Sequence, residues 1–339
     1  MVTLNWPLTA PAPEDMRWIG VEDPSAVVAC RQAGLALASR LQFPAAKADQ
    51  LALAITEAGS NLHKHATQGL LHLAINRSGD EPGIQLVTID AGPGFRNVSE
   101  AMRDGHSTAG TLGIGLGAID RLADFCELYS QPGHGSALVA RFWPSGPQPA
   151  LSWAGLIRPL ASETQCGDRF GAARTGDTVT AILCDGLGHG PLAASASAEA
   201  VEAILEDPAG GPAVLLERVH RRLGHTRGGA VGIVELTGQV VRFAGLGNIA
   251  ASILADGSRK SMLSVPGVAG HQARTIRQFD YVAPPGAAII LHSDCVSSRW
   301  DAKSLPGLEY KDPLVICAML LAEAGINRDD AGLLVLKPS

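Results

Sequence analysis

The stretch TVTAILCDGLGHG, residues 178–190, decides the fold of the second half of this chain of 339 residues. It opens with a run of threonine and apolar residues, which predicts a buried strand, and the run ends at Asp185 and Gly186. A single aspartate at a strand end is usually a turn or helix-cap residue, and Asp185 is also placed to cap a helix expected from residue 191. The meaning of Asp185 therefore depends on whether the pattern recurs.

The pattern recurs in three further motifs, which are CGDRF (166–170), LHSDC (291–295) and NRDDAGLLVL (327–336). Their acidic residues are Asp168, Asp294, Asp329 and Asp330. Carboxylates gathered at buried strand ends raise one another's pKa unless a cation neutralises them. Oxygen-only ligands suit Mg²⁺ or Mn²⁺ rather than Zn²⁺. The motifs therefore predict a site for two divalent ions that activate a water for attack on phosphorus.

The first half of the chain holds a different polar set on an expected helix that ends in EAGSNLHKHA (57–66). Apolar residues at helical spacing mark the core side of this helix, and Glu57 and Asn61 lie one turn apart on another side. The amide oxygen of Asn61 can ligate Mg²⁺ that carries ATP phosphates, and the carboxylate of Glu57 can accept a proton from a hydroxyl. Taken alone, this spacing indicates only a polar helix face.

Two glycine-containing segments follow that helix, DAGPGF (90–95) and AGTLGIGLGAIDRLAD (109–124). Asp90 ends an apolar strand and can accept a hydrogen bond from an adenine amino group, while Gly92 and Gly94 let the backbone approach a ligand. The second segment leads into a helix, so its backbone N–H groups can point at phosphates. Its glycines are Gly110, Gly113, Gly115 and Gly117. Together the segments predict an ATP site.

Composition limits the other functions open to the chain. The net charge is −6, so nothing favours binding to nucleic acid or to an anionic membrane. The N-terminal residues lack the basic and apolar regions of a signal peptide, and no apolar run is long enough to span a bilayer. The six cysteines are widely spaced without a C-x-x-C pair, which fits reduced thiols. We expect a cytoplasmic protein.

Two domains of α+β type are expected from the order of the predicted elements. The segment PSGPQPA (144–150) is rich in proline and predicts a linker between a domain at 1–143 and a domain at 151–339. Helices are expected at 26–43, 45–66, 114–125, 191–206, 211–224 and 312–324. Strands are expected at 71–78, 83–90, 126–131, 136–143, 151–158, 177–185, 229–236, 239–247, 249–255, 287–293 and 331–337.

The order of the motifs over residues 25–143 resembles the GHKL superfamily of ATPases and kinases. Within it, the short domain is most similar to the serine/threonine kinases of bacterial partner-switching systems, the RsbT and anti-sigma-factor type. This resemblance implies a Bergerat-type ATP-binding α/β sandwich with ATP and Mg²⁺ as cofactors. It also implies that Glu57 is the base for the substrate hydroxyl, that Asn61 is the Mg²⁺ ligand, and that Asp90 and the glycines bind the nucleotide.

The order of the acidic motifs over residues 152–337 resembles the metal-dependent type 2C (PPM) serine/threonine phosphatases of the SpoIIE-like branch. The segments HTRGGAVGIVEL (225–236) and AGLGNIAA (244–251) are similar to those of RsbX. The resemblance implies an α-β-β-α sandwich with two Mn²⁺ or Mg²⁺ ions. Asp185 would bridge the ions with help from the Gly186 carbonyl. The other ligands would be Asp168, Asp294 and Asp329, with Asp330 as a ligand or a supporting group.

The sequence departs from that phosphatase pattern at two positions, because Cys295 stands where the family has glycine and Gly332 where it has threonine. Neither change removes a carboxylate. Cys295 either crowds its loop, makes it redox-sensitive or is an ordinary core thiol. We expect His189 to pack beside the ligands rather than to bind metal. No basic phosphate clamp is evident near the acidic motifs.

Both resemblances together predict a bifunctional regulator of bacterial stress signalling, with a kinase domain and a phosphatase domain. Its partners would be STAS-domain regulatory proteins, in phosphorylated and unphosphorylated forms, with a sigma factor or a downstream switch protein as a further candidate. Two opposed activities on one residue would waste ATP, so the domains would address different partners or be gated by binding. Two alternatives stay open. The first domain is an ATP-dependent, anti-sigma-like binding module without kinase activity, or the second is a scaffold that has lost its activity.

Overall fold

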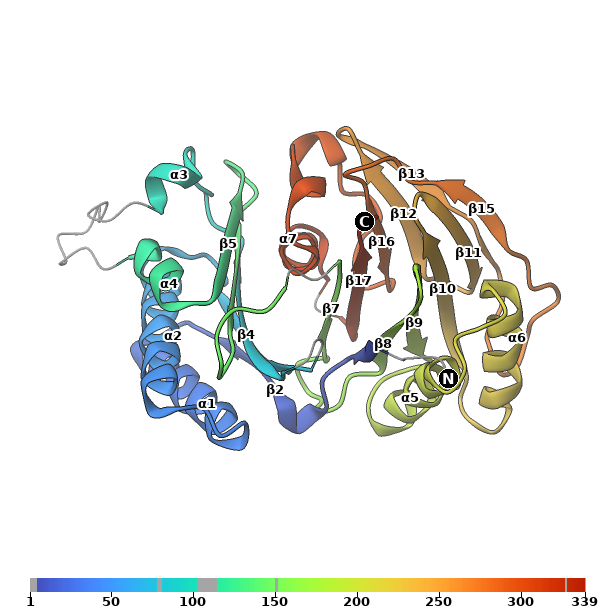
Figure 1. The fold of residues 1–339 in the computed structure, drawn as a ribbon, viewed down its shortest axis with the longest axis horizontal. Helices are drawn as coiled ribbons and strands as arrows, with labels where there is room; N and C mark the ends of the chain where they lie inside the picture. Colours follow the sequence, from blue (N-terminus) through green and yellow to red (C-terminus); the bar gives the residue numbers. More distant parts are fainter. Residues whose placement is uncertain (1–4, 78–80, 103–114, 150–151, 327, 339) are drawn as a thin grey trace. The chain divides into compact units, whose positions relative to one another are not determined.

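The computed structural model describes residues 5–77, 81–102, 115–149, 152–326 and 328–338, and they form two compact units (Figure 1). The N unit comprises Pro11–Ala150 together with Leu321–Glu323. The C unit comprises Met1–Ala10, Leu151–Leu320 and Ala324–Ser339. The sequence predicts one domain over residues 1–143, whereas the structure groups residues 5–10 with the C unit.

The N unit is a layer of helices on an antiparallel sheet with strand order β2-β3-β4-β6-β5. Its strands are β2 (Met16–Gly20), β3 (Leu70–Asn76), β4 (Gly83–Asp90), β5 (Phe125–Ser130) and β6 (Ser136–Phe142). Its helices are η1 (Pro13–Asp15), α1 (Pro24–Arg40), α2 (Ala45–His65), α3 (Val98–Ala101) and α4 (Leu116–Leu122).

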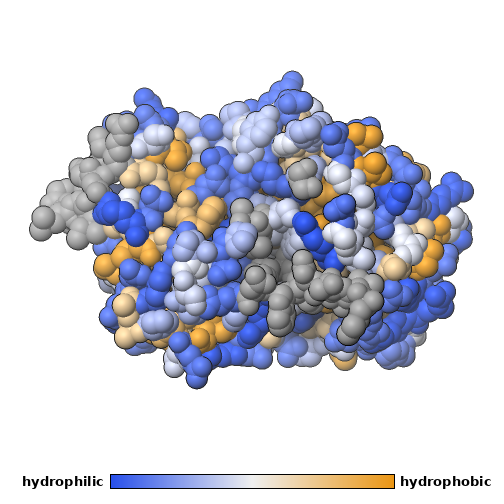
Figure 2. Space-filling view, viewed as in Figure 1, coloured by the Kyte–Doolittle hydropathy of each residue, from blue (hydrophilic) through white to orange (hydrophobic). Residues whose placement is uncertain are grey.

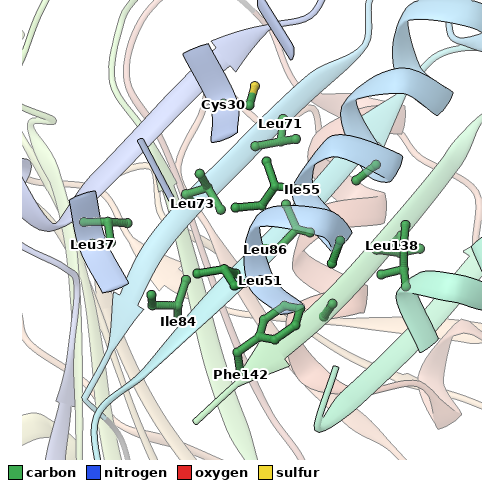
Figure 3. Packing of buried hydrophobic residues seen from close by; sticks show 14 of the residues in the cluster. Cys30, Leu37, Leu51, Ile55, Leu71, Leu73, Ile84, Leu86, Leu138 and Phe142 are labelled. Atoms are coloured by element: carbon green, nitrogen blue, oxygen red, sulfur yellow. The ribbon is translucent and has the colours of Figure 1, made fainter. Parts of the chain in front are cut away.

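The core of the N unit lies between the sheet and helices α1 and α2 (Figure 3). Leu51 and Ile55 of α2 meet Leu73 and Leu86 of the strands, and all four side chains are fully buried. The start of α1 is fixed by the Asp23 carboxylate, which accepts hydrogen bonds from the backbone N–H groups of Ser25 and Ala26. This packing sets the position of α2, which carries the predicted Glu57 and Asn61.

The C unit contains two sheets. The larger has the order β1-β8-β9-β10-β11-β14, with β15 also pairing β11, and the smaller has the order β13-β12-β16-β17-β7. The strands of the larger sheet are β1 (Asn5–Thr9), β8 (Asp168–Thr175), β9 (Thr178–Gly186), β10 (Gly229–Thr237), β11 (Val240–Leu246), β14 (Ser264–Val265) and β15 (Phe279–Val282). Those of the smaller sheet are β7 (Trp153–Arg158), β12 (Ala250–Ala255), β13 (Ser258–Met262), β16 (Ala288–His292) and β17 (Ala331–Leu336).

Helices cover the outer faces of both sheets of the C unit. Helix α5 (Pro191–Leu205) packs on β8 and β9, and α6 (Pro212–Arg222) packs on β10 and β11. Helix α7 (Pro313–Ala324) lies on the smaller sheet, where the Cys317 thiol donates to the Ala154 carbonyl of β7 at 3.7 Å. The short helices are η2 (Leu223–His225), η3 (Ala302–Ser304) and η4 (Leu308–Tyr310). The predicted α+β class and the α-β-β-α sandwich are confirmed.

The two sheets of the C unit meet where glycines leave room. A Cβ atom at Gly155 of β7 would lie 2.6 Å from the Phe170 ring of β8, so the ring packs directly on the glycine backbone. A Cβ atom at Gly332 of β17 would lie 2.9 Å from Oδ2 of Asp168 on β8. Asp168 therefore lies between the sheets, where β16 and β17 can also contribute side chains.

Polar residues predominate on the face of the molecule that Figure 2 shows, and apolar residues form small separate patches there. No helix in the described part of the chain is long and apolar enough to cross a membrane.

Candidate functional site

Asp168 and Asp185 form the centre of the acidic site in the C unit. Asp168 is the first residue of β8 and Asp185 the penultimate residue of β9, and the two are directly paired in the antiparallel register. This register brings the two carboxyl groups close enough for the charge of Asp185 to act on Asp168. The pairing register of two strands thus brings together residues that are 17 positions apart in the sequence.

The remaining predicted aspartates gather around this pair. Asp294 follows β16, and Asp329 and Asp330 precede β17, which pairs with β16. Burial and the charges of Asp294 and Asp329 raise the pKa of Asp185 to about 7. Burial and the charge of Asp185 raise the pKa of Asp168 well above its usual value. The structure therefore brings all five acidic residues of the predicted set into electrostatic contact.

Asp330 supports the site through the backbone. Its Oδ1 accepts a hydrogen bond from the Leu160 N–H at 2.7 Å, and its Oδ2 accepts one from the Gly167 N–H at 2.7 Å. Both oxygens of this buried carboxylate therefore hold the loop that leads into Asp168. The sequence leaves open whether Asp330 is a metal ligand or a supporting group, and this geometry favours the supporting role.

The carboxylates are turned toward protein partners in the structure. Asp294 accepts from the Asn248 side-chain amide at 2.6 Å, and Asp329 accepts from the Asp330 N–H at 2.9 Å. Accordingly, among the described residues no three His, Cys, Asp or Glu side chains already converge on one ion position.

The donor set nevertheless fits a divalent cation. Oδ2 of Asp168 is buried and has no hydrogen-bond partner among the described residues. An unpartnered carboxylate oxygen among four other carboxylates is costly unless a cation balances the charge. Mg²⁺ and Mn²⁺ prefer such oxygen ligands. At the predicted Gly186, a Cβ atom would lie 2.2 Å from the Ala193 carbonyl oxygen, so only glycine fits there.

The structure adds residues that the sequence reasoning missed. Ser293 accepts a hydrogen bond from the Gly332 N–H at 2.9 Å, and Gly332 itself packs against Asp168. Asn248 orients Asp294. Arg227, from the loop before β10, lies 3.3 Å through Nη1 from the position of a Cβ at Gly188. A basic group therefore does stand beside the acidic motifs. The three residues lie in the segments LHSDC, AGLGNIAA and HTRGGAVGIVEL. These segments were recognised as motifs, but the three residues within them were not singled out.

His189 and Cys295 lie at the edge of the acidic site. Nδ1 of His189 is 2.8 Å from Oε1 of Glu163, so a carboxylate outside the acidic set holds this ring. Burial and the charge of Asp294 raise the pKa of the Cys295 thiol to about 11, so the thiol is protonated at neutral pH. A protonated buried thiol is a weak nucleophile and a poor metal ligand.

The predicted nucleotide site in the N unit begins with Glu57 and Asn61 on α2. Both side chains are partly buried, and burial raises the pKa of Glu57, an effect that Lys64 partly offsets. Nδ2 of Asn61 is buried without a hydrogen-bond partner among the described residues. A buried amide nitrogen is rarely left unpaired, so the Asn61 side chain has the capacity to bind a ligand.

Asp90 is fixed by its own loop and by the neighbouring strand. Its Oδ1 accepts from the Gly92 N–H at 2.7 Å, and its Oδ2 accepts from the Ser136 hydroxyl, which faces it across β4 and β6. A Cβ atom at Gly94, where φ is +70°, would lie 2.1 Å from the Gln131 carbonyl oxygen. The loop thus packs against the β5–β6 turn at a distance that only glycine allows. Ser136 was not predicted, although it begins the expected strand 136–143.

The glycine-rich segment is only partly described. Gly110 and Gly113 lie outside the described residues. Gly115 is the N-cap of α4, where a Cβ atom would meet none of the described residues within 4 Å, and Gly117 is buried in the first turn. The Asn61 amide, which lacks a partner among the described residues, fits a bound nucleotide.

Comparison with known proteins gives a family match for the N unit. The profile of the histidine kinase-like ATPase domain matches residues 21–142. The serine/threonine-protein kinase RsbT of Bacillus subtilis (strain 168) is 32% identical over 117 residues, which cover 34% of this chain and 88% of RsbT.

Among solved structures, RsbX in complex with magnesium matches 57% of this chain and 98% of its own length, with 17% identity and a TM-score of 0.49. The SiaA-PP2C domain of Pseudomonas aeruginosa matches 55% of this chain and 85% of its own length, with 18% identity and a TM-score of 0.45. The fold of the C unit is assigned from its own two sheets and three helices.

Proposed function

Because the chain belongs to the family of histidine kinase-like ATPases that includes the serine/threonine kinase RsbT, we propose that it is a bifunctional regulator of protein phosphorylation. The N unit would transfer phosphate from ATP to a serine or threonine of a partner. The C unit would hydrolyse phosphoserine or phosphothreonine. The observation that carries the second half is the direct pairing of Asp168 and Asp185 in the strand register, with an unpartnered carboxylate oxygen of Asp168 buried between two sheets.

In the N unit, positioning and electrostatics carry most of a phosphoryl transfer. Asn61 would hold Mg²⁺ and with it the phosphates of ATP. Asp90, fixed by Gly92 and Ser136, would select the adenine. Glu57 would accept the proton of the substrate hydroxyl, and its raised pKa supports this role because a stronger base takes a proton more readily.

In the C unit, Asp168, Asp185, Asp294 and Asp329 would hold two divalent ions, with the Gly186 carbonyl beside them. The chemistry that bound Mn²⁺ or Mg²⁺ supplies at such carboxylates is Lewis-acid activation of water and of the phosphoryl group. Asp330 would keep the Asp168 loop in place through the Leu160 and Gly167 N–H groups. Ser293 and Asn248 would orient Asp168 and Asp294 for binding.

We propose STAS-domain regulatory proteins as the partners, because the N unit resembles the RsbT-type kinases of bacterial partner-switching systems, which phosphorylate such proteins. The two units would act on different partners, or partner binding would gate one of them, since ungated action on one residue would only consume ATP. The protein would work in the cytoplasm, which agrees with its six free cysteines.

The proposal is tested by incubating the full chain with a STAS-domain protein, [γ-³²P]ATP and Mn²⁺. Label should enter the partner when the C unit is inactivated by Asp185→Asn, and wild-type protein should release phosphate from a phosphorylated partner. If phosphate is released but no label ever enters a partner, while ATP binds, the N unit is a nucleotide-dependent binding module. If neither reaction occurs with Mn²⁺ or Mg²⁺, the proposed function is wrong.

A further inference from the structure

The loop that carries Arg227 is held against the loop that follows Asp185. The Leu187 N–H donates to the Gly228 carbonyl at 2.9 Å, and Gly229 is paired opposite Gly186 in the sheet. The Gly228 N–H in turn donates to the Thr226 hydroxyl at 2.9 Å. Arg227 is therefore fixed through its backbone beside the acidic site, and its position does not depend on its own side chain.

The Arg227 guanidinium is exposed beside Gly188, and no described carboxylate forms an ion pair with it. Arginines elsewhere in the C unit behave differently. Arg218 pairs with Asp207 at 3.0 Å, and Arg222 pairs with Glu206 at 3.0 Å. A guanidinium without an ion pair, on a loop paired beside the strand end that carries Asp185, can bind an anion that the carboxylates alone would repel.

Two exposed leucines flank the same loop. Leu187 is 51% exposed and Leu192, in the first turn of α5, is 58% exposed. Together they place exposed apolar side chains on both sides of Gly188 in the sequence, and the Leu187 backbone is bonded to the loop that carries Arg227. Exposed apolar side chains around a polar anchor are typical of surfaces that bind another protein.

We propose that Arg227 binds the phosphoryl group of a phosphoprotein substrate, and that Leu187 and Leu192 contact an apolar residue next to the phosphorylated serine or threonine. The charge of Arg227 complements the phosphate dianion, and the leucines complement the protein segment that carries it. This inference rests on the proposed phosphatase function of the C unit. It assigns substrate recognition to groups outside the predicted metal ligands.

The test measures hydrolysis by the full chain with Mn²⁺ of p-nitrophenyl phosphate and of two phosphoserine peptides, one with leucine and one with glycine beside the phosphoserine. Arg227→Ala should lower kcat/KM for all three about 10- to 100-fold, the range expected for a charge-assisted hydrogen bond, and Arg227→Lys should restore part of it. Inhibition by inorganic phosphate should weaken by a similar factor. Arg218→Ala, which removes a surface ion pair beyond the other end of α5, is the matched control and should behave as wild type.

Leu187→Ser and Leu192→Ser should lower kcat/KM for the leucine peptide only, because the other substrates lack the apolar contact. Unchanged kcat/KM and unchanged phosphate inhibition in Arg227→Ala would overturn the role of Arg227. Equal losses on both peptides, or none, in the leucine variants would overturn the apolar contact. If the wild-type chain hydrolysed none of the substrates, the proposed function itself would fall, and this inference with it.

Discussion

Asp168 and Asp185 face each other as a directly paired couple on β8 and β9, and the charge of Asp185 acts on the buried carboxyl group of Asp168. In the absence of a cation this arrangement keeps protons on the site, because burial and neighbouring carboxylates raise both pKa values. A divalent cation would replace those protons, so metal binding and the stability of the C unit should be linked.

Addition of Mn²⁺ should therefore stabilise the protein against heat. At a concentration about 100 times Kd, a ligand that binds only the folded state adds about 2.7 kcal/mol. Asp168→Asn should remove most of this effect, since it takes away the buried oxygen that lacks a partner. The midpoint of thermal unfolding with Mn²⁺ and with EDTA measures the effect. An equal rise in Tm in wild type and in Asp168→Asn would contradict the predicted site.

Asp330 and Asp329 are adjacent but should differ in their effect on stability. Asp330→Ala leaves the Leu160 and Gly167 N–H groups without their acceptor, which should lower the free energy of unfolding by about 2–4 kcal/mol. Asp329→Ala loses only a bond to the next backbone N–H and should change it by less than about 1 kcal/mol. Urea unfolding without metal compares the two variants. Equal losses would show that Asp330 does not hold the loop.

Glu57→Gln keeps the shape of the side chain and removes its basicity. We expect ATP affinity to stay at the wild-type level while phosphoryl transfer to a partner falls about 100- to 10,000-fold, the range for loss of a general base. Nucleotide titration and transfer of ³²P to the partner give the two readouts. A variant that transfers phosphate at the wild-type rate would exclude Glu57 as the base.

His72 should make the N unit sensitive to acid. The ring is 1% exposed, with its centroid 4.4 Å from that of Trp18, and burial lowers its pKa to about 3. Because the folded-state pKa lies below the unfolded value of about 6.5, the unfolded chain binds the proton first as pH falls. The contribution of His72 to stability is therefore complete above about pH 6.5 and is lost progressively toward pH 3.

The slope from this group reaches about 1.4 kcal/mol per pH unit. Urea unfolding of wild type and His72→Gln between pH 7 and pH 4 measures it, and the variant should have a flatter profile. His63→Gln, at an exposed position on α2, serves as the control and should keep the wild-type slope. Parallel profiles for wild type and His72→Gln would contradict the prediction.

Elements with strong periodicity were predictable from the sequence. Helix α2 was expected at 45–66 and spans Ala45–His65, and β4 was expected and found at residues 83–90. Strands with weak local signals were missed. β8 contains glycine and two arginines, and its strand conformation depends on pairing with β1 and β9. β13 is a short, largely polar strand and β15 has only four residues, and both lie at sheet edges, where tertiary pairing outweighs local propensity.

The site residues also fall into those that a local sequence pattern indicates and those whose roles depend on tertiary contacts. Asp185, Asp294 and the pair at 329 and 330 end or begin apolar runs, so the sequence indicated them directly. Ser136 and Arg227 were not predicted, because their roles depend on strand register and loop contact with residues distant in the chain. The N-terminal strand β1 was missed for a similar reason, since it gains its place by pairing with the edge of β8.

We propose that one chain holds two independent phosphoryl-transfer sites, one in each unit. The most direct measurement compares Asp185→Asn and Asn61→Ala in Mn²⁺-dependent hydrolysis of p-nitrophenyl phosphate and in binding of ATP with Mg²⁺. We predict that Asp185→Asn loses hydrolysis and binds ATP as wild type does, while Asn61→Ala shows the reverse. Loss of both properties in either variant, or of neither in both, would contradict the claim.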